Sequence, residues 1–311
     1  MDKRIIFMGT PEFAVASLAA LIDNGYNVVA VITSPDKPAG RGLQLTQSAV
    51  KKYAIEKGLE ILQPLKLKDP DFLKELENLN ADIQVVVAFR MLPELVWDMP
   101  PLGTVNVHGS LLPQYRGAAP INWAIINGET ETGVTTFKLK HQIDTGNILL
   151  QQTIRIEPNE NAGELHDKMM KIGADLLVKT LRGLFNNELK EVPQLVIDET
   201  QIKHAPKIFS ETCEISWNKR TDEIVNFIRG LSPYPGAYTK LNGKKLKIYS
   251  ALKSNLSNKI VEENNGICTD GKTFLRFKTF DGFVDVIDIQ PEGKKRMNIA
   301  DFLRGNKINT K

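Results

Sequence analysis

The residues best suited to chemistry lie in one stretch of the chain, Thr104 to Asn127. It begins with an apolar alternation in which Asn106 and His108 stand two residues apart, so both side chains project from the same face of a strand. An amide and an imidazole on one face can converge on one substrate atom. The alternative is that each only hydrogen-bonds nearby backbone, as most buried polar side chains do.

A carboxylate after the next predicted strand is the third candidate. Asp144 lies two residues before Gly146, between strands predicted over 133–138 and 148–156. In such a turn the carboxylate can point inward. An aspartate before Thr-Gly is also common in a plain Asx turn, so the residue type alone does not decide between the two.

The first part of the chain alternates strand and helix, which predicts the framework for these groups. A buried strand over 4–8 is followed by a helix over 11–24, capped by Thr10, and by a second strand over 27–33. This pattern predicts an α/β, Rossmann-like domain with an open, mostly parallel sheet and its chemistry at the carboxyl ends of the strands. Gly9 alone falls short of a GxGxxG motif, so we infer no dinucleotide site.

Two loops are expected at that edge of the sheet. The segment 34–49 carries two prolines and two glycines around Lys37 and Arg41, which predicts a long, exposed loop. The segment 83–88 is the most apolar strand and is expected at the centre of the sheet. A second loop, 89–93, follows it directly.

From Ile208 the pattern changes to short alternating strands separated by Asn-Gly, Asp-Gly and similar turns, after a helix around 222–229. Five strands are expected, over 237–241, 245–251, 266–269, 274–277 and 284–290. They predict a small, OB-like antiparallel β-barrel. The chain is therefore divided into a catalytic domain (1–189), a linker (190–207) and a C-terminal domain (208–311).

The charge is small overall but uneven. The net charge is +3, and residues 206–311 hold 19 Lys or Arg against 12 Asp or Glu, which leaves −4 on residues 1–205. A basic C-terminal third suggests that a polyanion binds there. A solvated basic face without a partner is the alternative.

Composition excludes several other classes of protein. No apolar run reaches the length of about 18 residues that a transmembrane helix needs, and the start MDKRIIF does not resemble a secretory signal. The two cysteines and four histidines show no metal-ligand spacing, so no metal is expected. We expect a cytoplasmic protein.

Four ordered blocks of sequence resemble the folate-dependent formyltransferases. They are PDKPAGRG, NVHGSLLPQYRGAAPI, IDTG, and LSPYPGA with the later QPEGKKRM. The resemblance runs essentially from GTPEF to KKRM, and it is strongest to the members that act on methionyl initiator tRNA. It implies transfer of the formyl group of 10-formyltetrahydrofolate to the free amino group of that tRNA, for translation initiation.

The resemblance also implies roles for particular residues. Asn106 and His108 would stabilise the oxyanion of the tetrahedral intermediate, and His108 would also carry a proton. Asp144 would orient the imidazole or accept the amine proton, and the choice of base between it and His108 stays open. Neither a covalent intermediate nor a metal is needed.

Substrate contacts follow in the same way. Folate would lie against Ser110, Leu111, Leu112 and Pro113, and against Phe89, Met91 and Leu92 of the second loop. This loop departs from the family pattern, in which Tyr-Gly and an extra residue before Leu-Pro are frequent. We therefore expect a slightly reshaped pterin pocket and do not count Arg90 among the contacts. Lys37 and Arg41 would contact the tRNA, with the basic barrel on its phosphates. The family implies a monomer.

Two other functions stay open from sequence alone. A formyltransferase acting on an amino-sugar nucleotide or another small amine would share the three catalytic residues but would not need the Lys37–Arg41 loop or a basic second domain. An RNA-binding module with an inert α/β domain would bind tRNA without folate, and would leave Asn106, His108 and Asp144 without a role.

Overall fold

The computed structural model describes residues 3–39, 44–195, 198–254 and 266–308. The chain divides into two compact units. The first unit contains residues 1–117, 133–154 and 166–203, and the second contains 118–132, 155–165 and 204–311.

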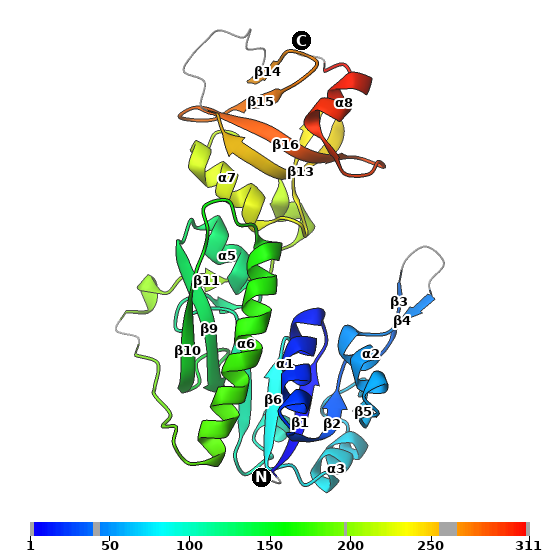
Figure 1. The fold of residues 1–311 in the computed structure, drawn as a ribbon, viewed down its shortest axis with the longest axis vertical. Coiled ribbons are helices and arrows are strands. Elements are labelled where there is room, and N and C mark those ends of the chain that lie inside the picture. Colours follow the sequence, from blue (N-terminus) through cyan, green and yellow to red (C-terminus); the bar gives the residue numbers. More distant parts are fainter. Residues whose placement is uncertain (1–2, 40–43, 196–197, 255–265, 309–311) are drawn as a thin grey trace. The chain divides into compact units, whose positions relative to one another are not determined.

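A seven-stranded sheet is the framework of the first unit (Figure 1). Its order is β10-β9-β7-β6-β1-β2-β5. The strands are β1 (Arg4–Gly9), β2 (Asn27–Ile32), β5 (Ile61–Leu62), β6 (Ile83–Val87), β7 (Thr104–His108), β9 (Glu131–Lys138) and β10 (Ile148–Arg155). Strands β1, β2, β5, β6 and β7 pair in parallel, whereas β9 joins β7 antiparallel. The mostly parallel α/β sheet expected from sequence is confirmed, with β6 at its middle.

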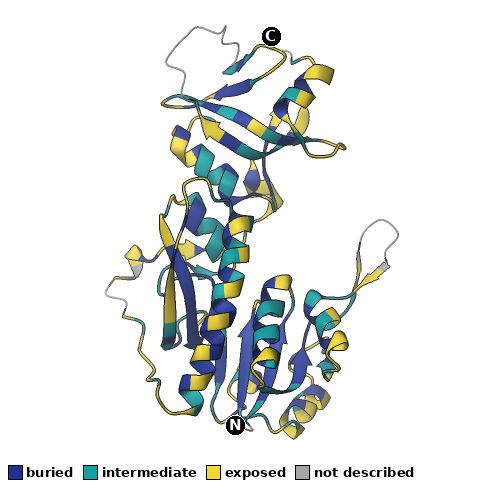
Figure 2. Ribbon diagram, in the orientation of Figure 1, coloured by how far each residue is buried: buried dark blue, intermediate teal, exposed yellow. Residues whose placement is uncertain are grey.

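Burial explains the apolar strands. Every residue of β6 is buried, and so are the last five of β1 (Figure 2). A strand covered on both faces needs apolar side chains at successive positions rather than at alternate ones. Met8, Ile32 and Val86 share one core cluster with Phe72 and Val96.

The helices of the first unit follow the predicted pattern with two local departures, an additional helical turn and a missing cap. They are α1 (Glu12–Asp23), α2 (Ala49–Glu56), α3 (Pro70–Asn78), the unexpected single turn α4 (Glu94–Trp97), and α6 (Ala162–Phe185), which continues from the second unit. The expected Thr10 cap is wrong, because Pro11 is extended at the N-cap and no side chain bonds the first turn. A Cβ at Gly9 would lie 2.6 Å from Ala14 Cβ, so glycine permits the helix to start against β1.

The segment expected to be an irregular loop, 34–49, contains a small hairpin. Its strands are β3 (Lys37–Ala39) and β4 (Gln44–Thr46), which pair antiparallel. Asp36, the residue before β3, anchors the hairpin by accepting hydrogen bonds from Lys51 Nζ (2.6 Å) and Gln63 Nε2 (2.9 Å). Lys37 is exposed on β3, and Arg41 lies outside the described residues.

The second unit is built on a curled antiparallel sheet, as the OB-like prediction required (Figure 1). Its order is β12-β13-β16-β15-β14, with β17 paired to β16. The strands are β12 (Ala237–Leu241), β13 (Lys244–Lys253), β14 (Ile267–Thr269), β15 (Leu275–Lys278), β16 (Phe283–Pro291) and β17 (Met297–Asn298). Asn242 and Gly243 both have positive φ, as the tight Asn-Gly turn between β12 and β13 demands.

Helices α5 (Pro120–Ile126), α7 (Thr221–Gly230) and α8 (Ile299–Gly305) complete the second unit. Its core includes Ile228 of α7, Phe302 of α8 and Val286 of β16. The remaining short elements of the chain are β8 (Arg116–Gly117), β11 (His204–Ala205) and the 3₁₀ turns Glu199–Gln201 and Ser210–Cys213. Among the described residues, no helix combines the length and the apolarity needed to cross a bilayer.

Candidate active site

Strand β7 places Asn106 and His108 on the same face, as their spacing predicted. Asn106 is half-buried, in register with Val86 of β6 and Phe137 of β9. His108 ends the strand and is only 6% exposed. A buried imidazole needs defined hydrogen-bond partners, and its two ring nitrogens have different surroundings.

The backbone carbonyl of Tyr115 determines which nitrogen of His108 carries hydrogen. His108 Nε2 lies 2.9 Å from Tyr115 O, and a carbonyl can only accept, so Nε2–H donates. In the neutral imidazole the lone pair is therefore on Nδ1. That atom lies 3.8 Å from Asp144 Oδ2, so a proton bound at Nδ1 would sit beside a carboxylate.

The connection between β9 and β10 brings Asp144 to this position. Residue pairs Val105–Lys138 and His108–Thr135 put the end of β9 beside the start of β7, so the connection must run back along the sheet to reach His108. Asp144 Oδ2 accepts a hydrogen bond from Gly117 N at 2.9 Å, and its side chain is 12% exposed. The turn is sterically tight, because a Cβ at Gly146 would lie 1.6 Å from Lys138 O.

Unusual backbone conformations mark the same region. Asp144 (φ 54°), Tyr115 (φ 59°) and Ala88 (φ 47°) have left-handed backbone although none is glycine. Asp144 and Tyr115 both contact the His108 ring, and Ala88 follows β6 directly. Left-handed non-glycine residues cost of order 1–3 kcal/mol each and gather at functional sites, which supports this region as the site.

A side chain that sequence did not single out joins the two segments around Asp144. Gln194 Nε2 donates to the carbonyls of Asp144 (2.8 Å) and Gly146 (2.9 Å). Its Oε1 accepts from Arg116 Nη2 (2.7 Å) and Nε (3.2 Å). Gln194 comes from residues 190–203, which we call the strap, a part of the predicted linker. Its partners are 48 to 78 residues distant in the chain, so no local pattern could have identified it.

The loop expected to hold folate, 110–113, is fixed by Thr135 of β9. Thr135 Oγ1 donates to Ser110 O (2.6 Å) and accepts from Leu112 N (3.1 Å) and Gln151 Nε2 (2.9 Å). Ser110 and Leu112 are buried, whereas Leu111 and Pro113 are half-buried. Ser110 Oγ is itself bonded to Gln114 O at 2.6 Å, so this hydroxyl serves the loop.

The second expected folate loop presents its residues differently. Phe89 and Leu92 are half-buried against the core cluster that contains Val86, and Met91 is 76% exposed. Arg90 hydrogen-bonds the carbonyls of Pro64 and Leu65 through its terminal nitrogens, and burial lowers the pKa of its guanidinium. Arg90 thus ties this loop to the segment after β5.

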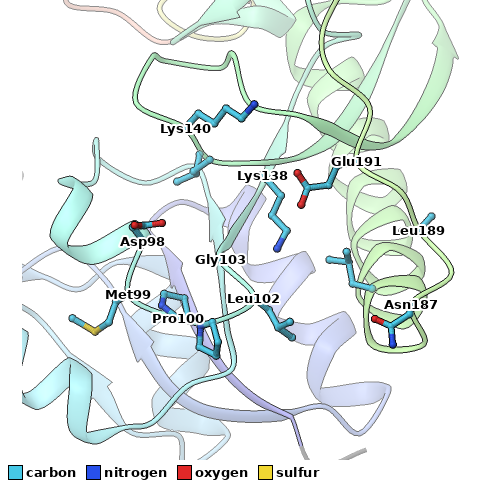
Figure 3. Close-up of a pocket in the computed structure, with 13 residues that line it drawn as sticks. Asp98, Met99, Pro100, Leu102, Gly103, Lys138, Lys140, Asn187, Leu189 and Glu191 are labelled. Atoms are coloured by element: carbon cyan, nitrogen blue, oxygen red, sulfur yellow. The ribbon is translucent and has the colours of Figure 1, made fainter.

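A cavity of about 610 Å³ in the first unit is separate from these residues (Figure 3). It is lined by Gly103, which precedes β7, and by Lys138 and Glu191, whereas Asn106, His108 and Asp144 do not line it. Burial is the main reason that the pKa of Lys138 is lowered, and Glu191 opposes that shift. Across the described ranges, no group of three His, Cys, Asp or Glu side chains is arranged to hold a metal ion.

Comparison with known proteins adds the family to this geometry. Residues 3–181 match the formyl transferase family model, and residues 207–307 match the model of the formyl transferase C-terminal domain. The chain belongs to the formyltransferase family. Within it, two methionyl-tRNA formyltransferases are close relatives. That of Phocaeicola vulgatus is 57% identical over 98% of this chain and 96% of its own. That of Azobacteroides pseudotrichonymphae is 54% identical over 97% and 96%.

A solved structure shares the fold at lower similarity. The N-formyltransferase from Helicobacter canadensis, determined with folinic acid and dTDP-3-aminofucose, superimposes with a TM-score of 0.68. It is 23% identical and covers 93% of this chain and 99% of its own. The two family models and the close relatives confirm the formyltransferase predicted from four sequence blocks. The fold shared with the solved structure covers 93% of this chain.

Proposed function

We infer that this protein transfers the formyl group of 10-formyltetrahydrofolate to the α-amino group of methionyl initiator tRNA, for translation initiation. The observation that carries this conclusion is the identity of 57% to a methionyl-tRNA formyltransferase over almost the whole of both chains. The sugar-modifying structure shares the fold at 23% identity, so it does not favour an amino-sugar substrate.

The reaction needs three things from the site. The amine must attack as a neutral group, so its proton has to leave during or after attack on the formyl carbon. The formyl oxygen gains negative charge in the tetrahedral intermediate. When the intermediate collapses, N10 of the folate takes a proton and leaves with the electron pair of the broken C–N bond, which yields tetrahydrofolate and formylmethionyl-tRNA.

We propose that His108 and Asp144 handle the proton together. The lone pair at His108 Nδ1 is available because Nε2–H is committed to Tyr115 O. An imidazolium formed there would have the Asp144 carboxylate 3.8 Å away as its counter-charge. We therefore assign the base to His108, whose Nδ1 lone pair is available, with Asp144 as its charge partner. The same proton can pass from His108 to N10.

Asn106 completes the proposed catalytic group. Its amide is on the His108 face of β7, where N–H donors can stabilise the developing oxyanion. We place the folate against Ser110, Leu111, Leu112 and Pro113, and against the loop with Phe89, Met91 and Leu92. Met91 is the most open of these side chains, which suits a contact made only when ligand is bound.

We assign tRNA binding to Lys37 and Arg41 and to the basic C-terminal third. We place domain boundaries at 1–189, 190–207 and 208–311, with the middle segment as the linker. We also propose that the protein acts as a monomer in the cytoplasm, where its charged tRNA and folate substrates would be found.

One assay tests this function against its alternatives. Charged initiator tRNA, uncharged tRNA and an amino-sugar nucleotide are each incubated with the protein, with and without 10-formyltetrahydrofolate. We expect formylation only of charged tRNA and only with the folate. Formylation of the sugar but not of the tRNA would contradict the proposal, and so would tRNA binding without any transfer.

A further inference from the structure

We propose that Gln194 is a positioning residue for catalysis, which holds the Asp144 carboxylate where His108 needs it. The proposal rests on the function given above, because it assigns Gln194 a part in formyl transfer. It also extends that function to the strap, a segment outside the four blocks that identified the family.

Gln194 uses its whole hydrogen-bonding capacity at this place. The two hydrogens of its amide nitrogen go to the carbonyls of Asp144 and Gly146, at 2.8 and 2.9 Å. Its oxygen accepts twice from Arg116. A glutamine has two donors and one oxygen with two lone pairs, so no other hydrogen bond is left for it to make.

These four bonds join the segment that carries the Asp144 carboxylate to the segment that donates a hydrogen bond to it. One segment is the turn 144–146 itself, which runs back along the sheet and has left-handed backbone at Asp144. The other is β8, in which Arg116 precedes Gly117, the residue whose N–H donates to Asp144 Oδ2. Gln194 therefore fixes both the backbone that carries the carboxylate and the donor that orients it.

The hydrogen bonds of Gln194 are not needed to attach the strap, because other residues of the strap already hold it in place. Val192 pairs with Ile148 through two backbone hydrogen bonds of 2.7 and 2.8 Å. Further along, Gln114 Oε1 accepts from Lys203 N, and Tyr115 N donates to Lys203 O. The strap is thus attached on both sides of Gln194. The side chain of Gln194 therefore serves to join Arg116 to the turn 144–146.

Two substitutions of Gln194 by side chains of similar size distinguish its bonds to the turn from its bonds with Arg116. Gln194→Met removes all four, whereas Gln194→Glu keeps the oxygen that faces Arg116 but replaces the donor nitrogen that faces the turn by an acceptor oxygen. We expect each to lower kcat about tenfold or more, since small displacements of a catalytic group are costly. We expect KM for either substrate to stay within about twofold of wild type, because Gln194 is proposed to act through Asp144 and not to touch substrate.

The decisive test combines Gln194→Met with Asp144→Ala. If Gln194 acts through Asp144, the double variant is no slower than Asp144→Ala alone, because residues that act as a unit are non-additive. Two losses that multiply would overturn the proposal, and so would wild-type kcat for both single variants at Gln194. An unchanged melting temperature excludes loss of fold as the cause.

The matched control is Gln201→Ala on the same strap. The Gln201 side chain is exposed and donates a long hydrogen bond (3.4 Å) to Asp198 of the same strap, whereas the contact with Gln114 is made by the Gln201 backbone carbonyl. The substitution leaves that carbonyl in place, so we expect wild-type kinetics. If wild-type protein formylates no charged tRNA, the proposed function fails. If wild type is active and Gln194→Met equals Gln201→Ala, the function stands and the role of Gln194 is wrong.

Discussion

At the scale of single residues, the site is defined by backbone groups as much as by side chains. The carbonyl of Tyr115 sets the tautomer of His108, and the N–H of Gly117 orients Asp144. Their residue types carry no sign of these contacts, because every residue has a carbonyl and nearly every one an N–H. Spacing along β7 was enough to select Asn106 and His108, whereas their surroundings depend on tertiary structure.

Thr135 shows how such backbone groups are held. The change Thr135→Val keeps the shape of the side chain but leaves Ser110 O and Leu112 N, both in the loop proposed to hold folate, without their Thr135 partner. An unsatisfied buried group costs about 1–3 kcal/mol. We expect the free energy of unfolding to fall by about that amount in urea titrations. An unchanged free energy would mean that the loop is fixed by other contacts.

At the scale of elements, predictability followed the regularity of the sequence. Strand β6 was found because four of its five residues are apolar, and all five are buried. The hairpin of β3 and β4 was missed because each strand has only three residues, too few to show a period. Helix α8 was not predicted either, although Asn298 caps it through a hydrogen bond to Asp301 N. Its seven residues directly follow the short strand β17, which hid its start.

The strap and the β9–β10 connection were the elements least open to prediction. Both lack periodicity, and both take their conformation from partners far away in sequence. Gln194 meets Arg116 across 78 residues, and Asp144 meets Gly117 across 27. Asp144 was a candidate from its position in a turn between two predicted strands, and the resemblance of IDTG to the family favoured a catalytic role for it. The path that brings Asp144 to His108 was not predicted.

The hairpin gives a prediction at this scale. The pKa of Asp36 lies below its usual value because of the hydrogen bond from Lys51, and then of that from Gln63. A lowered folded pKa means that this anchor is intact above the unfolded pKa of about 3.9 and is lost as the pH falls through the lower folded value. We expect Asp36→Asn at pH 7 to speed amide hydrogen exchange in β3 and β4, because the charge that pairs with Lys51 is gone.

Exchange in β6, a strand of the seven-stranded sheet to which β3 and β4 do not belong, serves as the internal control. Equal exchange in wild type and Asp36→Asn would show that the hairpin does not depend on Asp36. Acidification of wild type through the lowered folded pKa of Asp36 is expected to open the hairpin as the substitution does, once exchange rates are corrected for their intrinsic pH dependence. No change across that range would count against the anchor.

At the scale of the whole molecule, the uneven charge of the chain predicts that binding of tRNA depends on salt more strongly than binding of folate does. The excess of +7 on residues 206–311 contrasts with −4 on the remainder, and tRNA is the larger polyanion. We expect KM for methionyl-tRNA to rise steeply with KCl, because each phosphate contact contributes a slope of about −0.7 to −0.9 to log affinity against log salt. KM for the folate is expected to change little over the same range.

The substitution Lys37→Gln refines this test. If Lys37 binds a phosphate, the salt slope for tRNA should fall by about one while KM for folate stays constant. A slope identical to that of wild type would remove Lys37 from the tRNA contacts. Equal salt dependence for both substrates would instead contradict a tRNA-specific basic surface.

The central claim is that Asn106, His108 and Asp144 act on one formyl carbon, and the single-turnover rate of formyl transfer to methionyl-tRNA tests it most directly. The rate is measured at saturating protein and folate for the alanine variant of each residue, with folding checked by circular dichroism. We expect each variant to be slower than wild type by about 10²-fold or more. Rates within about threefold of wild type for all three would contradict the account.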